Sequence, residues 1–241
     1  MKKSNEEIAI TVLNPSIEEY SSIESITKED QDILLDLNEG TLGYRILKRG
    51  VDIILSLSAL ILLSPFLLIL IILIKIEDKK ASAIFKQKRV GKNGNIFYMY
   101  KFRSMVSNAE SLLDDLLHLN EVDGAMFKIK DDPRITKIGK FIRSTSIDEL
   151  PQLWNVLKGE MSLVGPRPPL VREVDLYTSY EKQRLIVTPG CTGLWQATER
   201  NNVGFKEMVE LDLIYIAKKS FFYDFNIIIK TALSLILKKS Y

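Results

Sequence analysis

An apolar stretch over residues 51–74 most constrains how this chain can fold, because Asp52 is its only charged residue. As one helix it would be about 36 Å long, enough to cross a hydrocarbon core of about 30 Å. Ser64-Pro65 lies just past its middle, and a proline there removes one backbone donor and bends or breaks the helix. Basic residues flank both ends, namely Arg45, Lys48 and Arg49 before the stretch and Lys75, Lys79 and Lys80 after it.

Three interpretations of this stretch are open: a re-entrant membrane hairpin, a kinked single pass, and a buried core helix of a soluble protein. Lys and Arg gather at the cytoplasmic ends of membrane segments, so basic residues at both ends favour two ends on the same face. We therefore expect residues 41–80 to form a re-entrant membrane helix that breaks at Ser64-Pro65 and returns.

Charge is distributed unevenly along the 241 residues. Residues 1–40 carry ten acidic and three basic residues, which predicts an acidic mobile tail, whereas the remainder has a net charge of +9. A basic body beside a membrane segment suits lipid headgroups and phosphate-bearing substrates. Nucleic acid is not an expected partner, because neither a zinc-finger nor an RNA-recognition signature is present. The single cysteine, Cys191, excludes an intramolecular disulfide and is typical of a reducing, cytosolic compartment.

Beyond residue 80 the sequence predicts a small β-hairpin and several amphipathic helices. Residues 83–89 and 95–103 flank a turn at Asn93-Gly94, a dipeptide that tolerates positive φ. Helices are expected over 106–119, 152–158, 171–187 and 205–219, with an interfacial helix over 221–239. The expected fold class is α+β and mostly helical, that of a monotopic membrane protein in which residues 81–241 form the cytoplasmic catalytic domain.

The sharpest cluster of reactive residue types is RSTSIDELPQ, which begins at Arg143. Ser146 could be a helix N-cap, but Pro151 would then fall where its missing N–H is needed, so the proline favours Asp148 as the cap. A helix cap would by itself explain such an aspartate. The dipole of that helix start would also keep the carboxylate ionised, and its N–H groups could bind phosphate. Arg143 as a phosphate donor and Glu149 as a Mg²⁺ ligand complete a set that suits phosphoryl transfer.

Three spaced motifs resemble one known family. They are IFKQKRVGKNGNIFYMYKFRSM, DDPRITKIGKFIRSTSIDELPQLWNVLKGEMSLVGPRP and TPGCTGLWQATERN. Over about residues 44–240 the chain is thereby similar to the monotopic phosphoglycosyl transferases, bacterial sugar transferases that load a sugar phosphate onto a polyprenyl phosphate. Members of this family have a re-entrant membrane helix broken at a Ser-Pro pair, which corresponds to Ser64-Pro65 here.

The resemblance implies a ping-pong reaction. Asp148 would attack the β-phosphate of a UDP-sugar and release UMP, and undecaprenyl phosphate would then take the sugar phosphate from the aspartyl intermediate. Glu149 would bind Mg²⁺ beside Asp148. The implied role is the first membrane step in the synthesis of exopolysaccharide, capsule or O-antigen-type glycans, at the cytoplasmic face of the bacterial inner membrane. A homodimer is left open, as is the purpose of the acidic tail.

Further positions in the matching motifs are expected to bind substrate. They are Arg143, Arg167, Lys101, Arg103, Arg200 and Gln152. From the pattern alone, Lys101 and Arg103 could instead be solvated strand residues. Arg200 follows Glu199, where relatives commonly carry glycine, and this departure bears on whether the loop places Arg200 against the nucleotide.

Two other functions are open from the sequence. A membrane-attached interaction module would use the basic face without catalysis and would release no nucleotide. A conventional glycosyltransferase would release a nucleoside diphosphate instead of a monophosphate. Within the favoured interpretation, GLWQ at residues 193–196 is more similar to the family members that use glucose or galactose than to those that use N-acetylated or diamino sugars.

Overall fold

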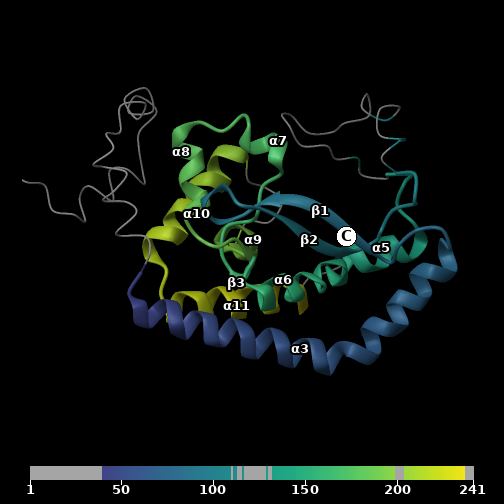
Figure 1. Cartoon of the computed structure of the whole chain (residues 1–241), viewed down its shortest axis with the longest axis horizontal. Coiled ribbons are helices and arrows are strands. Elements are labelled where there is room, and N and C mark those ends of the chain that lie inside the picture. The colour runs from purple at the N-terminus through teal and green to yellow at the C-terminus, as the bar shows by residue number, and fades with distance from the viewer. Residues whose placement is uncertain are drawn as a thin grey trace, which may run out of the picture.

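The computed structural model describes residues 40–109, 111–112, 116, 129, 132–198 and 204–236. The predicted acidic tail except Gly40, the residue Arg200 and half of the predicted helix over 106–119 lie outside the described residues, and the described residues 107–109 and 111–112 lie in turns instead of that helix. The elements in chain order are α3 (Leu42–Glu77), β1 (Ile84–Val90), η3 (Lys92–Gly94), β2 (Ile96–Phe102), α5 (Lys137–Ser144), η5 (Ile147–Glu149), α6 (Gln152–Lys158), β3 (Ser162–Val164), α7 (Val171–Val174), α8 (Ser179–Lys182), η6 (Gln183–Leu185), β4 (Gly190–Thr192), α9 (Leu194–Thr198), α10 (Phe205–Lys218) and α11 (Phe221–Ile236). The described part is mostly helical with a β-hairpin, as expected, and it also has a second, parallel two-stranded sheet of β3 and β4 that the sequence did not predict (Figure 1).

The apolar stretch lies in one continuous helix, α3, which starts where the Thr41 side chain accepts a hydrogen bond from the Tyr44 N–H at 3.2 Å. The predicted break at Ser64-Pro65 is instead a bend inside this helix (Figure 1). Pro65 has no N–H to donate to the Ile61 carbonyl, and the Ser64 hydroxyl donates to that carbonyl at 2.8 Å. Because the freed carbonyl is satisfied in this way, the helix continues past the proline.

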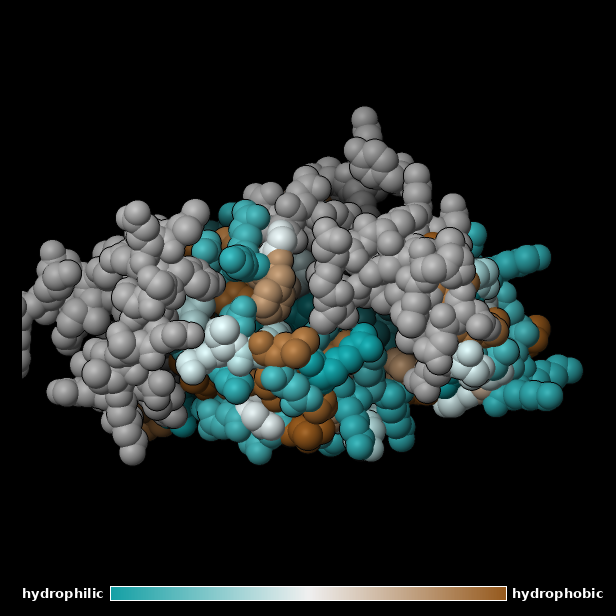
Figure 2. Space-filling model, turned by 90° about the horizontal axis from the view of Figure 1, so that it is seen from above, coloured by the Kyte–Doolittle hydropathy of each residue, from teal (hydrophilic) through white to brown (hydrophobic). Residues whose placement is uncertain are grey.

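Most of the surface of α3 is exposed and apolar. Among the described residues, α3 is the one helix that is long and apolar enough to cross a membrane. Large apolar side chains are exposed along its length, including Leu62 near the bend. The side of the molecule away from α3 differs, because the coloured part of Figure 2 mixes hydrophilic side chains with smaller hydrophobic patches. The molecule therefore has one apolar side, of the kind that marks contact with a membrane or a partner.

Before the bend, polar contacts fix α3 to the folded domain. Arg49 donates to the carbonyls of Val156 (2.6 Å) and Leu157 (2.8 Å) in the last turn of α6, where helix carbonyls lack intrahelical partners. The buried Asp52 carboxylate accepts from the Leu163 N–H in β3 at 3.0 Å. The only charge within the apolar stretch thus has a backbone partner, which a buried charge requires.

Asp224 in α11 makes a second link to the start of α3. Its buried carboxylate pairs with the Lys48 ammonium at 2.7 Å and accepts from the hydroxyls of Tyr44 (2.9 Å) and Tyr215 (2.8 Å). This residue interrupts the apolar sequence of the predicted interfacial helix. Its polarity is therefore used in a tertiary contact that holds α11 against α3.

After the bend, α3 returns to the same domain. Leu70 is buried in a cluster with Ile142 of α5. The Glu77 carboxylate accepts from the N–H groups of Lys137 (2.7 Å) and Ile138 (3.1 Å), the first residues of α5. Both ends of α3 are consequently attached to one folded body, and the bend lies at the edge of the molecule (Figure 1).

The predicted hairpin is confirmed, with β1 and β2 paired antiparallel. Asn93 and Gly94 have φ values of 55° and 80°, the positive values that this dipeptide tolerates. The hairpin is fixed to α6 by Asn155, whose amide donates to the Tyr98 carbonyl (2.7 Å) and accepts from the Tyr100 N–H (3.0 Å). One fully buried side chain thus joins the sheet to the helix that follows the candidate site.

Three predicted helices are confirmed, namely 152–158 as α6, 205–219 as α10 and 221–239 as α11, whose predicted last residues lie outside the described residues. The single helix expected over 171–187 is wrong, because this segment forms the short elements α7, α8 and η6. A capping box starts a new helix in its middle: the Thr178 hydroxyl accepts from the Glu181 N–H (3.3 Å), and the Glu181 carboxylate accepts from the Thr178 N–H (2.7 Å).

The role of Asn155 predicts a specific loss of stability. Asn155→Ala should lower the free energy of unfolding by about 1–3 kcal/mol, because it leaves the partly buried Tyr100 N–H without this partner. The matched control is Asn95→Ala, the same change at an exposed position of the hairpin turn. Chemical denaturation of the full chain in detergent measures both, and a loss for Asn155→Ala no larger than that for Asn95→Ala would contradict this role.

Candidate active site

Asp148 and Glu149 lie in η5, a single 3₁₀ turn between α5 and α6. Ser146 precedes them with a φ of 57°, a left-handed conformation that turns the chain sharply out of α5. The predicted N-cap role of Asp148 is wrong, because α6 begins at Gln152 and Pro151 occupies its cap position. The 3₁₀ turn intervenes between the aspartate and the helix start, so the carboxylate does not bond the first turn of α6.

The Asp148 carboxyl group is buried, with 9% of the residue exposed. Burial raises the pKa of Asp148, and the neighbouring Glu149 raises it further, whereas Lys101 and Arg143 act in the opposite direction. The expectation that the dipole of a helix start acts on this carboxylate is not met, because the 3₁₀ turn separates Asp148 from the start of α6. The net effect of the surroundings is a carboxylate that is poorly solvated and costly to keep charged.

Glu149 is shifted in the opposite direction. Burial acts to raise its pKa, but the ion pair with Lys101 (2.6 Å), the charge of Arg167 and a hydrogen bond from Gln152 outweigh burial and lower it. Lys101 lies in β2 and Gln152 is the first residue of α6, so the hairpin and α6 each contribute one side chain that interacts with this carboxylate. Lys101 is paired with Glu149 and its charge acts on Asp148, so it is not a solvated strand residue. Its contact with substrate stays a prediction.

Arg167 lies in the Pro-rich segment after β3, and its charge acts on Glu149. That segment is held against β1, because the Arg89 guanidinium donates to the Pro168 carbonyl (2.9 Å) and the Val90 N–H donates to the Pro169 carbonyl (3.0 Å). These two bonds fix the backbone on the C-terminal side of Arg167.

Arg89, which the sequence did not indicate as a site residue, is buried, and the charges of Arg167 and Glu149 act on it. Burial and the charge of Arg167 lower the pKa of Arg89 to about 10, and Glu149 acts to raise it. The charges of two arginines and a glutamate therefore influence one another here. Two neighbouring arginines are suited to binding a polyanion such as a diphosphate. The available signal was strand alternation, since Arg89 shares a face of β1 with the apolar Phe85.

The remaining predicted residues are placed differently. Arg143 lies exposed on α5, where its charge acts on Asp148. Arg103 donates to the Ser82 carbonyl (2.8 Å) and lies over the Phe85 ring, and among the described residues no ion pair or hydrogen bond joins it to either acid. Arg200 lies outside the described residues. The structure thus gathers Lys101, Arg143, Arg167 and Gln152 around the acids, without Arg103.

The two acids are the metal-binding groups that this site offers. In the part of the chain that the structure describes, no group of three or more His, Cys, Asp or Glu residues could hold a metal ion. Mg²⁺ commonly takes only one or two carboxylates when substrate phosphates supply further oxygens. The donor set of Glu149 with Asp148 therefore fits Mg²⁺ in the presence of a phosphate-bearing substrate.

The raised pKa of Asp148 predicts that this residue costs stability. A carboxyl group whose folded pKa exceeds the unfolded value of about 3.9 destabilises the fold above its folded pKa, and the cost disappears as the pH falls toward 3.9. Asp148→Asn should therefore melt at an equal or higher temperature than the native chain at neutral pH, with the difference shrinking in acid. Thermal unfolding in detergent tests this, with Asp175→Asn at an exposed position as the control; a clearly lower melting temperature for Asp148→Asn would contradict it.

Comparison with known proteins agrees with the resemblance in the motifs. A model of the family described as bacterial sugar transferase matches residues 43–238. A galactosyl transferase, CpsE, of Streptococcus agalactiae is 52% identical over 190 residues, 78% of this chain and 42% of the relative. An undecaprenyl-phosphate galactose phosphotransferase of Salmonella typhimurium is 45% identical over 192 residues, 78% of this chain and 40% of the relative.

A third relative is similar in length to this chain. The exopolysaccharide production protein ExoY of Rhizobium meliloti is 39% identical over 188 residues, which are 76% of this chain and 83% of the relative. The chain thus spans less than half the length of the first two relatives but most of the third. The family match includes α3, the hairpin and the acidic pair. By this match, the chain belongs to the bacterial sugar transferase family.

Proposed function

We propose that this chain transfers a sugar 1-phosphate from a UDP-sugar to undecaprenyl phosphate and releases UMP, as the first membrane step of exopolysaccharide, capsule or O-antigen-type glycan synthesis. The names of the relatives support the reaction class, since they include an undecaprenyl-phosphate galactose phosphotransferase and an exopolysaccharide production protein. The single observation that carries the proposal is a buried aspartate beside a glutamate, with Lys101, Arg143 and Arg167 acting on the pair.

In the first step, an Asp148 carboxylate oxygen attacks the β-phosphorus of the UDP-sugar. A bond forms between that oxygen and phosphorus, and the bond from phosphorus to the bridging oxygen of the α-phosphate breaks. UMP leaves with the bridging oxygen and its electron pair, and the sugar phosphate stays on the enzyme as an acyl phosphate. A poorly solvated carboxylate is a reactive nucleophile, which is consistent with the burial of Asp148.

In the second step, a phosphate oxygen of undecaprenyl phosphate attacks the same phosphorus. The bond to Asp148 breaks, the carboxylate is regenerated, and the lipid diphosphate sugar is formed. Lys101, Arg143 and Arg167 offset the negative charge of the phosphates in both steps, the charge that otherwise repels an anionic nucleophile. Arg89 acts as a positioning residue, because it holds the backbone beside Arg167.

Mg²⁺ would be held by Glu149, whose lowered pKa keeps the carboxylate ionised at neutral pH. Bound there, the ion would neutralise charge on the pyrophosphate oxygens. Since Lys101 is paired with the same carboxylate at 2.6 Å, we expect Lys101 to turn toward the substrate phosphates when Glu149 takes a metal.

We further propose that α3 is re-entrant and that the domain lies on the cytoplasmic face of the inner membrane. Two observations support this placement: both ends of α3 are attached to the same domain, and its bend is exposed and apolar. Exposed aromatic side chains on α6 and α11, Trp154 and Phe222 among them, would lie at the bilayer surface. The acidic pair would then meet the phosphate of the lipid acceptor at headgroup depth.

The donor sugar is proposed to be galactose or glucose. The Streptococcus agalactiae and Salmonella typhimurium relatives are named for galactose, but another relative, from Aeromonas hydrophila, is named for N-acetylgalactosamine at 39% identity over 210 residues. The sugar ring is contacted mainly by loops, which vary between members of a family.

The released nucleotide tests the reaction. The full chain with Mg²⁺ and undecaprenyl phosphate should release UMP from labelled UDP-galactose or UDP-glucose, and chromatography separates UMP from UDP. Asp148→Asn should lower the rate at least about a thousandfold, because the attacking group is removed. Asp175→Asn, the same change at an exposed site, should act at the native rate. Release of UDP would indicate a conventional glycosyltransferase, and no release from any UDP-sugar would indicate an interaction module.

A further inference from the structure

A second site lies at the start of α3, away from the acidic pair. A cavity of about 520 Å³ opens there, within the range of about 300–1,000 Å³ that is usual for ligand pockets. It is bounded by the first turns of α3, the hairpin turn η3, the segments around Gly159 and Val187, and the end of α10. None of Lys101, Arg143, Asp148, Glu149 and Arg167 lines it.

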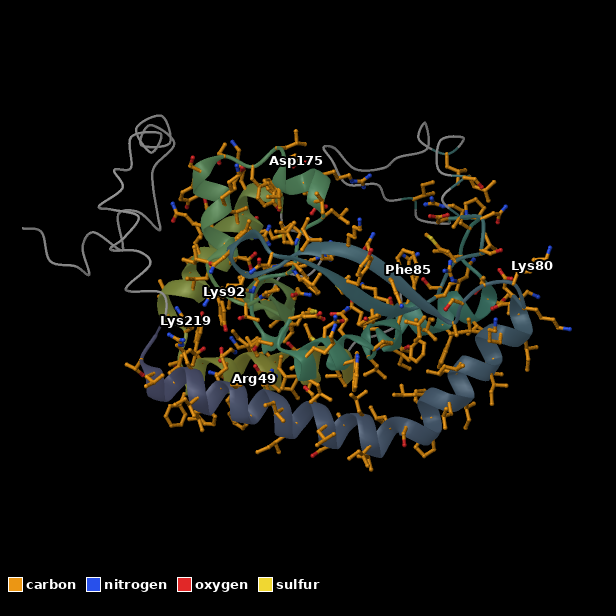
Figure 3. The ribbon with its side chains drawn as sticks, in the orientation of Figure 1. Arg49, Lys80, Phe85, Lys92, Asp175 and Lys219 are labelled. Atoms are coloured by element: carbon orange, nitrogen blue, oxygen red, sulfur yellow. The ribbon has the colours of Figure 1, made fainter. Side chains whose placement is uncertain are left out.

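The cavity is strongly basic. Five basic side chains and one acidic side chain line it, namely Arg45, Lys48, Arg49, Lys92 and Lys219 with Asp52. They come from three parts of the chain, and Figure 3 shows Arg49, Lys92 and Lys219 together near the beginning of α3. Because the charges arrive from separate elements, their grouping is a product of the fold and not of a run of lysines in the sequence.

Part of this basic lining is held rigidly. The Lys48 ammonium donates to the Val164 carbonyl (3.0 Å) and to Asp224, and Arg49 is fixed by two carbonyls of α6. Asp52 is occupied by the Leu163 N–H. A site whose side chains are already ordered loses less entropy when it binds a ligand.

The cavity also has an apolar edge. Leu42 and Ile46 line it and are largely exposed, at 68% and 65%. Leu47 on the same helix is exposed as well, at the beginning of the long apolar surface of α3. A ligand here would therefore place a charged group among the bases and an apolar part along α3. That combination is the chemistry of an anionic lipid.

We propose that this cavity binds the phosphate of an acidic phospholipid headgroup, separately from the acceptor lipid at the acidic pair. The bound lipid would fix the depth of the start of α3 and hence of the domain attached to it. This inference depends on the proposed membrane placement of α3 and is independent of the transfer reaction. Each lysine near a phosphate contributes about a fivefold gain in affinity.

Native mass spectrometry of the full chain in a neutral detergent tests the proposal. With dioleoyl phosphatidylglycerol added, the native chain should retain one lipid, and with dioleoyl phosphatidylcholine it should retain none at the same concentration. Lys92→Gln and Lys219→Gln should each weaken retention about fivefold. The matched control is Lys80→Gln, which removes the same charge at the other end of α3 (Figure 3) and should retain the lipid as the native chain does.

Three outcomes would overturn the proposal. They are equal retention of the two lipids, equal loss in the Lys80→Gln control, and displacement of phosphatidylglycerol by inorganic phosphate at equal concentration, which would identify a soluble anion as the ligand. UMP release by the same samples separates this inference from the proposed reaction. If Lys92→Gln loses the lipid but still releases UMP in detergent, the cavity is distinct from the catalytic site, and loss of both the lipid and UMP release would contradict the separation.

Discussion

The attachment of both ends of α3 to one folded body is the constraint on which the rest of the structure depends. Arg49 bonds the last carbonyls of α6 before the bend, and Glu77 accepts from the first N–H groups of α5 after it. These two helices flank the 3₁₀ turn that carries Asp148. The apolar helix α3 is therefore attached to the helix on each side of the candidate active site. A movement of either end of α3 would reach the acidic pair through α5 or α6.

The acidic pair shows how one lysine can serve two neighbouring carboxyl groups differently. Lys101 forms an ion pair with Glu149, whose pKa is lowered, while burial dominates at Asp148, whose pKa is raised. In the proposed reaction these opposite shifts fit a division of roles, in which the ionised member would hold a cation and the buried member would react. The burial that raises the pKa of Asp148 costs stability, which is common at sites where function and stability compete.

The sequence predicted the elements that depend on local signals. Asn93-Gly94 specified the hairpin because positive φ is a property of those residues themselves, and amphipathic spacing located α10. The division of 171–187 had a local signal as well, the Thr178 to Glu181 capping box, which the apolar pattern obscured. The cap role of Asp148 failed for a different reason, because the chain inserts a 3₁₀ turn there. For Arg89, strand alternation indicates the face of β1, but its contact with the Pro168 carbonyl, 79 residues later, has no local signal.

The topology of α3 tests the central claim most directly. In a chain with Cys191→Ala, a single cysteine at Gly43 or at Lys80 reports on one end of the helix, and both positions are exposed. An impermeant thiol reagent should label both in inside-out membrane vesicles and neither in intact cells, because both ends stay on the cytoplasmic face. Labelling of either position in intact cells would show that α3 crosses the membrane, and would contradict the account.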